Sequence, residues 1–212
     1  PGVANAREIF PRLHKRYLFA ESERFRLFDF YDNDGNLNEN VFAYTNGSGD
    51  ERVLVLYNNS LHGTAGWIQT SSPVAVGGDS QDLRTERLAH ALGIEADYRH
   101  YLIFREQRTG LWYIRNCGDL HDRGLYADLP GYRCQVFLDV REVTDTEQSH
   151  YARLADQLNG AGTPNLDRAL NPLVLGPLHA AFAGFANSGT LRSLMHRLAR
   201  AAAATAATDP RA

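Results

Sequence analysis

The sequence has almost no lysine, few sulfur-containing residues and no excess of positive charge. Lys15 is the only lysine, and arginine supplies the remaining positive charge. The arginines are scattered among aspartates and glutamates, and the formal net charge is -3 at pH 7. This pattern is typical of a GC-rich, alanine-rich coding sequence rather than of a phosphate-binding surface. We therefore expect no nucleic-acid partner.

Cysteine is also scarce, because Cys117 and Cys134 are the only two in the chain. Two thiols do not make a disulfide framework, and they are too few for a structural zinc site with four cysteine or histidine ligands at motif spacing. A single disulfide stays open as an alternative. We expect a pair of reduced, partly buried thiols in a cytoplasmic protein.

Long hydrophobic runs are missing as well. No segment approaches the roughly 20 apolar residues of a membrane span, and the alanine-rich residues 201–207 are too short and too weakly apolar. We therefore expect no membrane partner. The chain starts at Pro1 without an initiator methionine or a signal segment, which predicts a fragment or a processed chain.

The chain does contain many short β-prone runs between residues 25 and 145. They are residues 25–31, 41–46, 52–57, 101–106, 111–115 and 133–143. Asp34-Gly35 is a hairpin turn signal. In the last run Cys134, Val136, Leu138 and Val140 share one face and the other face is mainly polar, which predicts a half-buried strand. The remaining runs predict a mostly antiparallel β-domain.

Helical periodicity surrounds and interrupts these strands. Near the N-terminus apolar residues recur at helical spacing, at Ile9, Phe10, Leu13 and Tyr17. Residues 82–92 predict one inserted helix, with Ser80 as its N-cap and Gly93 as its C-terminal stop.

The period becomes helical again after residue 146. Residues 151–158 and 177–186 are helix candidates, and Thr163-Pro164 is a helix start signal. Ser188 then precedes an apolar stripe at the i, i+3, i+4 and i+7 positions, formed by Leu191, Leu194, Met195 and Leu198. We expect the chain to fray from about Ala201.

The motifs of common enzymes are absent: the sequence has no HExxH, no GxSxG, no P-loop and no GxGxxG. The best cluster of titratable groups is Asp119, His121, Asp122 and Arg123, which is either an acid/base site or, as we favour, a polar loop. A second group holds many oxygen ligands but departs from the spacing of a calcium loop, so we interpret it as a polar turn. Its members are Asp29, Asp32, Asp34, Asn36, Asn38 and Glu39. We expect no catalytic residue, metal or cofactor in this chain.

Three aromatic residues are candidates for carbohydrate binding, because flat aromatic rings stack on the apolar faces of sugars. They are Trp67, Trp112 and Tyr113. Trp112 and Tyr113 are adjacent in a predicted strand, so they must face opposite sides of the sheet. Burial in the core is the alternative for each ring.

Three stretches carry a family resemblance: residues 9–20, residues 41–59 and residues 124–142. The first resembles the last helix of a (β/α)₈ catalytic barrel and its exit. The second and third resemble the first and the closing strands of the C-terminal β-sandwich in bacterial α-amylase-family glycoside hydrolases. None of the family's catalytic motifs is present, so no catalytic residue transfers to this chain.

The resemblance implies an α+β fold, namely an antiparallel β-sandwich with an N-terminal helix, one inserted helix and a helical C-terminal extension. Its expected divisions are a residual barrel helix (1–20), the sandwich (21–145), the extension (146–200) and a disordered tail (201–212). Ile9, Phe10, Leu13 and Tyr17 would face the barrel.

The expected function is a non-catalytic domain that stabilises the barrel of an enzyme acting on α-glucans. Its partners would be the upstream barrel of the same polypeptide and an α-glucan. Two alternatives stay open. The first is a free-standing β-sandwich module that binds carbohydrate or protein, and the second is a small enzyme built on residues 119–123.

Overall fold

The computed structural model describes residues 24–47, 51–75, 83–185 and 188–207. The chain divides into two compact units, Pro1–Ala169 and Leu170–Ala212. The N-terminal helix expected in residues 1–20 lies outside the described residues, together with the four candidate barrel-interface residues Ile9, Phe10, Leu13 and Tyr17. Ser80, the expected N-cap of the inserted helix, lies outside them too.

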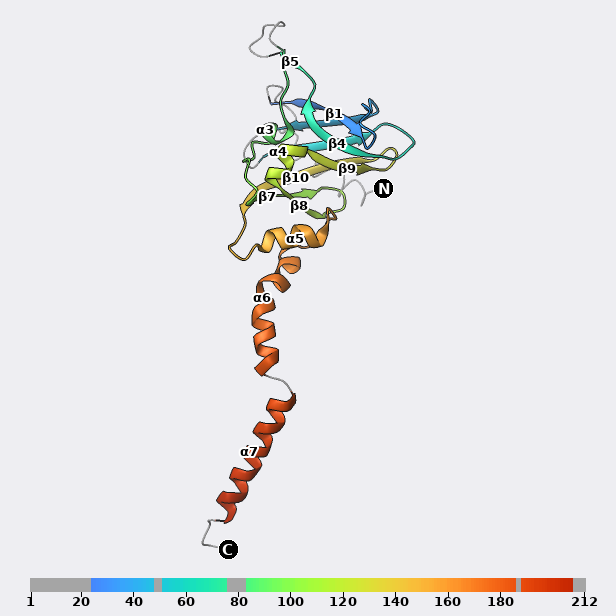
Figure 1. Cartoon of the computed structure of the whole chain (residues 1–212). Helices are drawn as coiled ribbons and strands as arrows, with labels where there is room; N and C mark the ends of the chain where they lie inside the picture. The colour runs from blue at the N-terminus through green and yellow to red at the C-terminus, as the bar shows by residue number, and fades with distance from the viewer. Residues whose placement is uncertain (1–23, 48–50, 76–82, 186–187, 208–212) are drawn as a thin grey trace. The chain divides into compact units, whose positions relative to one another are not determined.

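The first unit is built on one antiparallel sheet of eight strands in the order β8-β7-β10-β3-β2-β1-β4-β9 (Figure 1). The strands of this sheet are β1 (Arg26–Asp32), β2 (Val41–Asn46), β3 (Val53–Asn58), β4 (Thr64–Ser71), β7 (His100–Glu106), β8 (Trp112–Asn116), β9 (Leu125–Leu129) and β10 (Cys134–Thr144). A separate two-stranded ribbon pairs β5 (Val74–Ala75) with β6 (Leu83–Arg84).

The sheet curls into a half-barrel. Two irregularities in its ladders coincide with this curvature. The β1–β4 register shifts between Phe28 and Phe30, and the β10–β7 register shifts between Leu138 and Arg141, where Asp139 has φ +54°. An extra residue in one strand bends it and increases the local twist. The two shifts therefore account for part of the curl.

The predicted α+β class with an antiparallel sheet is confirmed, but the predicted β-sandwich is not. A sandwich requires two sheets packed face to face. Here the eight main strands form one continuous hydrogen-bonded sheet. The pairings of β3 with β10 and of β4 with β9 join strands that a sandwich would divide between two sheets.

The inner face of the half-barrel carries the main hydrophobic core. Apolar residues from seven strands of the sheet pack there, including Phe28, Phe30, Leu56, Ile68 and Leu129. Two short helices pack on the same cluster: α3 (Leu88–Ala91) and α4 (Cys117–Arg123). Their buried apolar side chains are Leu88, Ala89, Cys117 and Leu120. The two helices thus cover the core on the inside of the curve.

The outer face carries a smaller cluster of Val53, Val55, Val136 and Leu138. This is why the four apolar residues at the start of β3 are all buried: alternate residues serve the inner and outer clusters. Near β7 and β8 the helix α5 (His150–Leu158) packs beside the sheet, with Leu154 fully buried and Tyr151 stacked on Tyr101.

One connection sets the topology of the unit. The elements β8, α4 and β9 follow one another directly in the chain, yet β8 and β9 are the two opposite edges of the sheet. The helix α4 therefore leads the chain from one edge of the half-barrel to the other. Asn116 caps this helix, since its side-chain oxygen accepts the backbone N–H of Asp119 at 3.2 Å.

The inserted helix is shorter than predicted. Residues 83–84 form β6, and only Leu88–Ala91 is helical. Ser71 pairs with Glu86 through two hydrogen bonds, which hold the segment before α3 in an extended conformation against β4. Gly93 ends the helix as predicted: its φ is +58° and its N–H donates to the carbonyl of His90.

The second unit contains most of α6 (Leu166–Phe185), which begins in the first unit, and all of α7 (Ser188–Ala207). The helix α6 runs through Pro172 and Pro177, where the sequence predicted separate segments. Among the described residues no single helix has the length and apolar composition of a membrane span. The bent pair Leu166–Gly184 and Ser188–Ala201 meets that criterion together, by length and composition only.

Candidate functional site

A row of three aromatic side chains crosses the outer face of the sheet at β1, β4 and β9. Tyr31 lies directly opposite Trp67 in the β1–β4 ladder, and Trp67 lies directly opposite Tyr126 in the β4–β9 ladder. Residues in register on adjacent strands share one face. Since the neighbouring residues Phe30 and Ile68 point into the core, the row points outward.

The rings of this row are accessible. Tyr31 is 40% exposed and Tyr126 is 41% exposed, while Trp67 between them is half-buried. The centroids of Trp67 and Tyr126 are 5.1 Å apart, and their planes meet at 64°. Three rings in one row form an apolar platform with phenolic hydroxyls at both ends.

A guanidinium group holds the central ring in place. The Cζ atom of Arg123 lies 4.8 Å from the centroid of Trp67, within cation–π range. Arg123 is the last residue of α4, so the connection between the sheet edges also supplies this contact. Asn33 donates to the hydroxyl of Tyr126 at 3.4 Å. The orientation of the platform is thus set by contacts from two other segments.

A cavity of about 630 Å³ lies beside the platform. Its lining combines aromatic rings with hydrogen-bonding side chains, namely Asp29, Tyr31, Trp67, Gln69, Thr70, Ser71, Pro73, Thr85 and Arg123. Two of the polar groups are already oriented: Ser72 donates to Asp29 at 2.8 Å, and Gln69 donates to the carbonyl of Asp122 at 2.7 Å. An apolar surface with a few fixed polar groups is typical of a small-molecule site.

Gly66 allows this arrangement. A Cβ atom at this position would lie 2.0 Å from the backbone oxygen of Tyr31 and 2.9 Å from the Cα of Asp32. Only glycine lets β1 and β4 approach closely enough here to bring Tyr31 into register with Trp67. The glycine immediately before the tryptophan is therefore part of how the sequence builds the platform.

The structure separates the three carbohydrate-binding candidates predicted from sequence. Trp67 is the centre of the platform. The ring centroid of Trp112 lies 5.4 Å from Cζ of Arg105 and 5.7 Å from Cζ of Arg141, so two guanidinium groups contact it. Tyr113 faces the inner side, as their adjacency required, and its ring is 5.8 Å from Phe104. The sequence did not point to Tyr31 or Tyr126, and it singled out Arg123 only as a member of the titratable cluster at residues 119–123; strand alternation around Tyr126 was the one available signal.

A second cavity, of about 450 Å³, is lined by both edge strands and by residues 159–162. Tyr113 and Arg115 reach it from β8, and Tyr126 and Asp128 belong to its β9 side. Arg115 donates to the carbonyls of Ile114 and Gly160 at 2.8 and 2.9 Å. Burial lowers the pKa of this guanidinium from its ordinary value, because a charge out of water is less well solvated.

The cluster at residues 119–123 does not converge on one point. His121 is buried, with Nε2 2.8 Å from the carbonyl of Ile94, whereas Asp122 accepts a short hydrogen bond from the hydroxyl of Tyr98. Arg123 points to Trp67 instead. The segment is the helix α4 rather than the polar loop that we favoured.

The oxygen-rich group near Asp34 forms the turn between β1 and β2. Asp32 accepts the backbone N–H groups of Asn36 and Asp34 at 2.8 and 3.0 Å. These bonds, with that from Asn36 first, lower the pKa of the Asp32 carboxyl. The interpretation as a polar turn fits this geometry, since the carboxylate is committed to the backbone.

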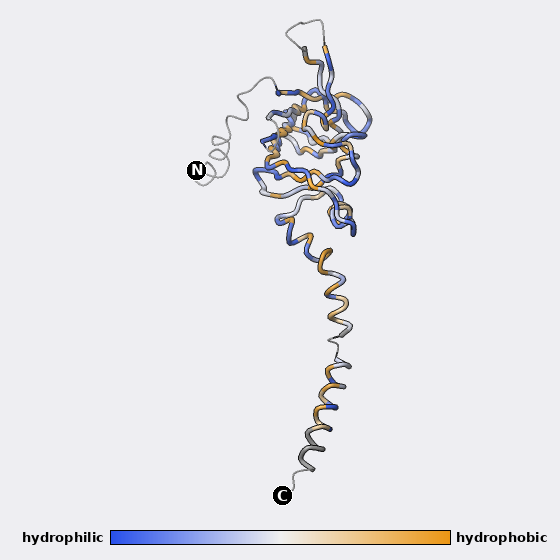
Figure 2. The backbone as a smooth tube through the Cα atoms, turned by 90° about the vertical axis from the view of Figure 1, so that its left-hand side faces the viewer, coloured by the Kyte–Doolittle hydropathy of each residue, from blue (hydrophilic) through white to orange (hydrophobic). Residues whose placement is uncertain are grey.

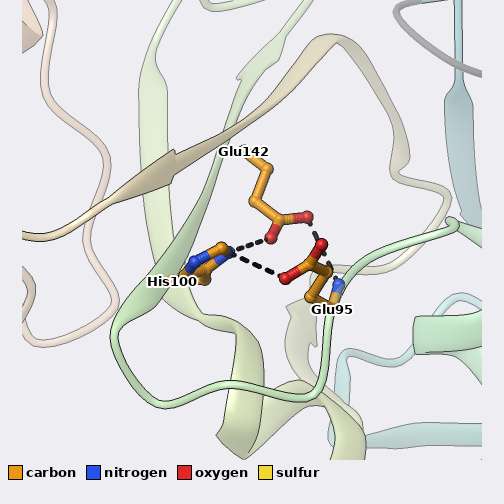
Figure 3. A group of neighbouring side chains, drawn as sticks. All are labelled: Glu95, His100 and Glu142. Carbon is orange, nitrogen blue, oxygen red and sulfur yellow. Dashed lines mark hydrogen bonds and ion pairs between the residues drawn. The ribbon is translucent and has the colours of Figure 1, made fainter.

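One group of described residues brings three metal-ligating side chains together: Glu95, His100 and Glu142, from three different segments (Figure 3). Nδ1 of His100 makes a short bond to Glu142 and lies 3.7 Å from Glu95. Glu142 also accepts the backbone N–H of Glu95 at 3.3 Å. One imidazole and two carboxylates suit Zn²⁺. Any ion would have to displace the proton between His100 and Glu142, and an ion pair accounts for the same convergence.

Comparison with protein-family models, with curated proteins and with solved structures finds no match to this chain.

Proposed function

We propose that this chain is a non-catalytic, carbohydrate-binding β-domain, and that the platform of Tyr31, Trp67 and Tyr126 is its sugar-binding surface. The observation that carries the proposal is the register of the three rings across β1, β4 and β9. A row of two exposed aromatic rings with a half-buried one between them suits a chain of pyranose rings, since each ring offers an apolar face for stacking.

Polar groups beside the platform support the same assignment. A sugar presents hydroxyl groups around its edge, and these need donors and acceptors within reach once water is removed. Asp29, Gln69 and Arg123 line the cavity next to Trp67 and offer both. The carboxylate of Asp29 accepts, the guanidinium of Arg123 donates, and the amide of Gln69 does both.

We further propose an α-glucan as the ligand and an α-amylase-type glycoside hydrolase as the parent. This part rests on the resemblance of residues 41–59 and 124–142 to strands of that family's C-terminal domain. In the fold these residues cover β2, β3, β9 and most of β10. The role in the parent would be to stabilise the barrel and hold glucan near it. Sequencing the DNA upstream of the Pro1 codon tests it: an open frame encoding a (β/α)₈ barrel with its carboxylates is the expected result.

The binding test uses the two tryptophans, which are the only ones in the chain. Native gel electrophoresis in amylopectin should retard the wild-type chain. Trp67→Ala should weaken the affinity at least tenfold, or about 1.4 kcal/mol, because it removes the centre of the platform. Trp112→Ala is the matched control and should keep the wild-type affinity.

Fluorescence then locates the ligand. In Trp112→Phe the tryptophan emission comes from Trp67 alone. Added maltoheptaose should change this emission, and the dissociation constant from the titration should match the one from the gel. Circular dichroism verifies that each variant is folded. A wild-type chain that amylopectin does not retard, or a Trp67→Ala variant of unchanged affinity, would refute sugar binding at this platform. Retardation by a β-linked glucan alone would support sugar binding at the platform but refute the proposal that the ligand is an α-glucan.

A further inference from the structure

The helix α7 presents an apolar face whose side chains are exposed. Leu191, Leu194, Met195 and Leu198 follow the i, i+3, i+4 and i+7 spacing, so they share one side of the helix. Their exposed fractions are 56%, 43%, 69% and 65%, respectively. In Figure 2 hydrophobic and hydrophilic residues recur in turn along this helix, as an amphipathic pattern requires.

The opposite face of α7 is basic. At about 100° per residue, the positions of Arg192, His196, Arg197 and Arg200 centre on the side of the helix opposite the apolar stripe. All four side chains are exposed. The helix is therefore divided into an apolar face and a polar face whose ionisable groups are all basic.

The surrounding sequence adds no negative charge. Every charged residue between Asp167 and Asp209 is an arginine, although the chain as a whole has a formal net charge of -3. The positive charge of the helical unit is thus not balanced by acidic residues, as it is in the rest of the chain. A surface that combines an exposed apolar stripe with unbalanced arginines is complementary to an apolar surface that bears anionic groups.

We propose that α7 binds an anionic lipid surface, lying in the plane of the membrane interface with its leucine stripe towards the acyl chains. A basic amphipathic helix is suited to this position, since its apolar face enters the boundary of the headgroups while its arginines contact the phosphates. The inference goes beyond the proposed sugar binding and departs from the expectation that this chain has no membrane partner.

Two other occupants of the face fit the charges less well. A second copy of α7 would bring two all-positive helices together, whereas paired helices usually carry opposite charges beside the apolar seam. A helix that crosses the bilayer would place Arg192, Arg197 and Arg200 in or near the hydrocarbon, which is unfavourable. Binding in the interface satisfies both faces at once.

Co-sedimentation of the full chain with vesicles tests the proposal. Vesicles of phosphatidylcholine with one quarter phosphatidylglycerol should bind the chain at least tenfold more tightly than pure phosphatidylcholine, and raising the salt from 0.1 to 0.5 M should weaken the binding. The variant Arg192→Gln/Arg197→Gln/Arg200→Gln should bind the anionic vesicles at least tenfold more weakly than the wild type. The variant Leu191→Ser/Leu198→Ser should lose as much affinity, because it removes half of the apolar face.

A variant of the first unit provides the matched control. Arg99→Gln/Arg108→Gln/Arg153→Gln removes the same charge from three exposed arginines and should bind like the wild type. Trp67→Ala should also bind vesicles normally, which separates this proposal from sugar binding.

Three outcomes would overturn the proposal. One is an equal loss of vesicle affinity in the α7 arginine variant and in the first-unit control variant, which would indicate a general charge effect. The second is equal binding to neutral and anionic vesicles. The third is a dimer in light scattering that Leu191→Ser/Leu198→Ser abolishes while vesicles bind nothing, which would assign the stripe to a second copy of the chain.

Discussion

The two cysteines differ in environment, and their chemistry should differ accordingly. Cys117 is buried at the start of α4, and burial raises the pKa of its thiol to about 12. A neutral thiol is a poor nucleophile, so Cys117 should stay unreactive near neutral pH. Cys134, on β10, is only half-buried.

We therefore expect Ellman's reagent at pH 8 to modify Cys134 and to leave Cys117 intact while the chain is folded. Counting modified thiols by mass spectrometry checks this. The chain unfolded in guanidinium should show two reactive thiols. Rapid modification of both in the folded chain would contradict the buried position of Cys117.

The contact between His100 and Glu142 predicts a pH dependence. The hydrogen bond to Glu142 is the largest cause that raises the pKa of His100, and the nearby charges of Glu142, Glu95 and Asp97 act in the same direction against desolvation. Because the folded pKa lies above the unfolded value of about 6.5, the pair stabilises the fold below that value. The stabilisation disappears as the pH rises through the folded pKa.

The variant His100→Asn should consequently lose more stability at pH 6 than at pH 9. Urea denaturation at the two pH values measures the difference. The same substitution at the exposed His62 is the control and should show no such change. An equal loss for His100→Asn at both pH values would mean that the imidazole contributes only by packing.

At the scale of elements, the β1–β4 pair depends on the glycine beside Trp67. Gly66→Ala should destabilise the fold by about 1–3 kcal/mol, because the added methyl group overlaps the backbone of β1. Gly63→Ala is the matched control, since its Cβ would meet its nearest atom at 3.6 Å. Urea denaturation compares the two, and equal stability would show that β1 can move aside freely.

The sequence identified most strands correctly, because alternation is a local property of a half-buried strand. Residues 41–46 coincide with β2, the run that became β7 starts one residue late, and the runs that became β3 and β8 are shifted by one residue. Prediction from the local sequence pattern failed where the structure of a segment depends on residues that are distant in the sequence. Leu83 and Arg84 pair with β5 instead of starting a helix, and the seven residues of α4 are too short for a clear helical period.

At the scale of the whole molecule, the two units should be separable. The two hydrophobic clusters consist of residues from the first unit. A chain that ends at Ala169, which keeps the buried Leu166, should therefore melt within a few degrees of the full chain. Thermal denaturation followed at 222 nm tests this. A drop of more than about 10 °C would show that the helical unit supports the sheet.

The curl of the sheet and the platform could not be predicted from local pattern. Alternation indicates which residues face the core, but it does not say how far a sheet bends or which strands form its edges. Trp67 was identified because tryptophan is a distinctive residue. Tyr31 and Tyr126 lie far from it in the sequence, and they meet it only through the β1–β4 and β4–β9 pairings.

The direct passage from β8 through α4 to β9 has a consequence for aggregation. A seven-residue helix is only about 10 Å long, so the two edges of the sheet are tethered close to each other. An open sheet is vulnerable because its edge strands can pair with another chain once they swing free. Here α4 ties the end of β8 to the start of β9, and Thr163 adds two backbone hydrogen bonds to Trp112 at the β8 edge. Unfolding of α4 should let the two edges move apart, so we expect variants that unfold this short helix to promote edge-to-edge assembly of the sheet.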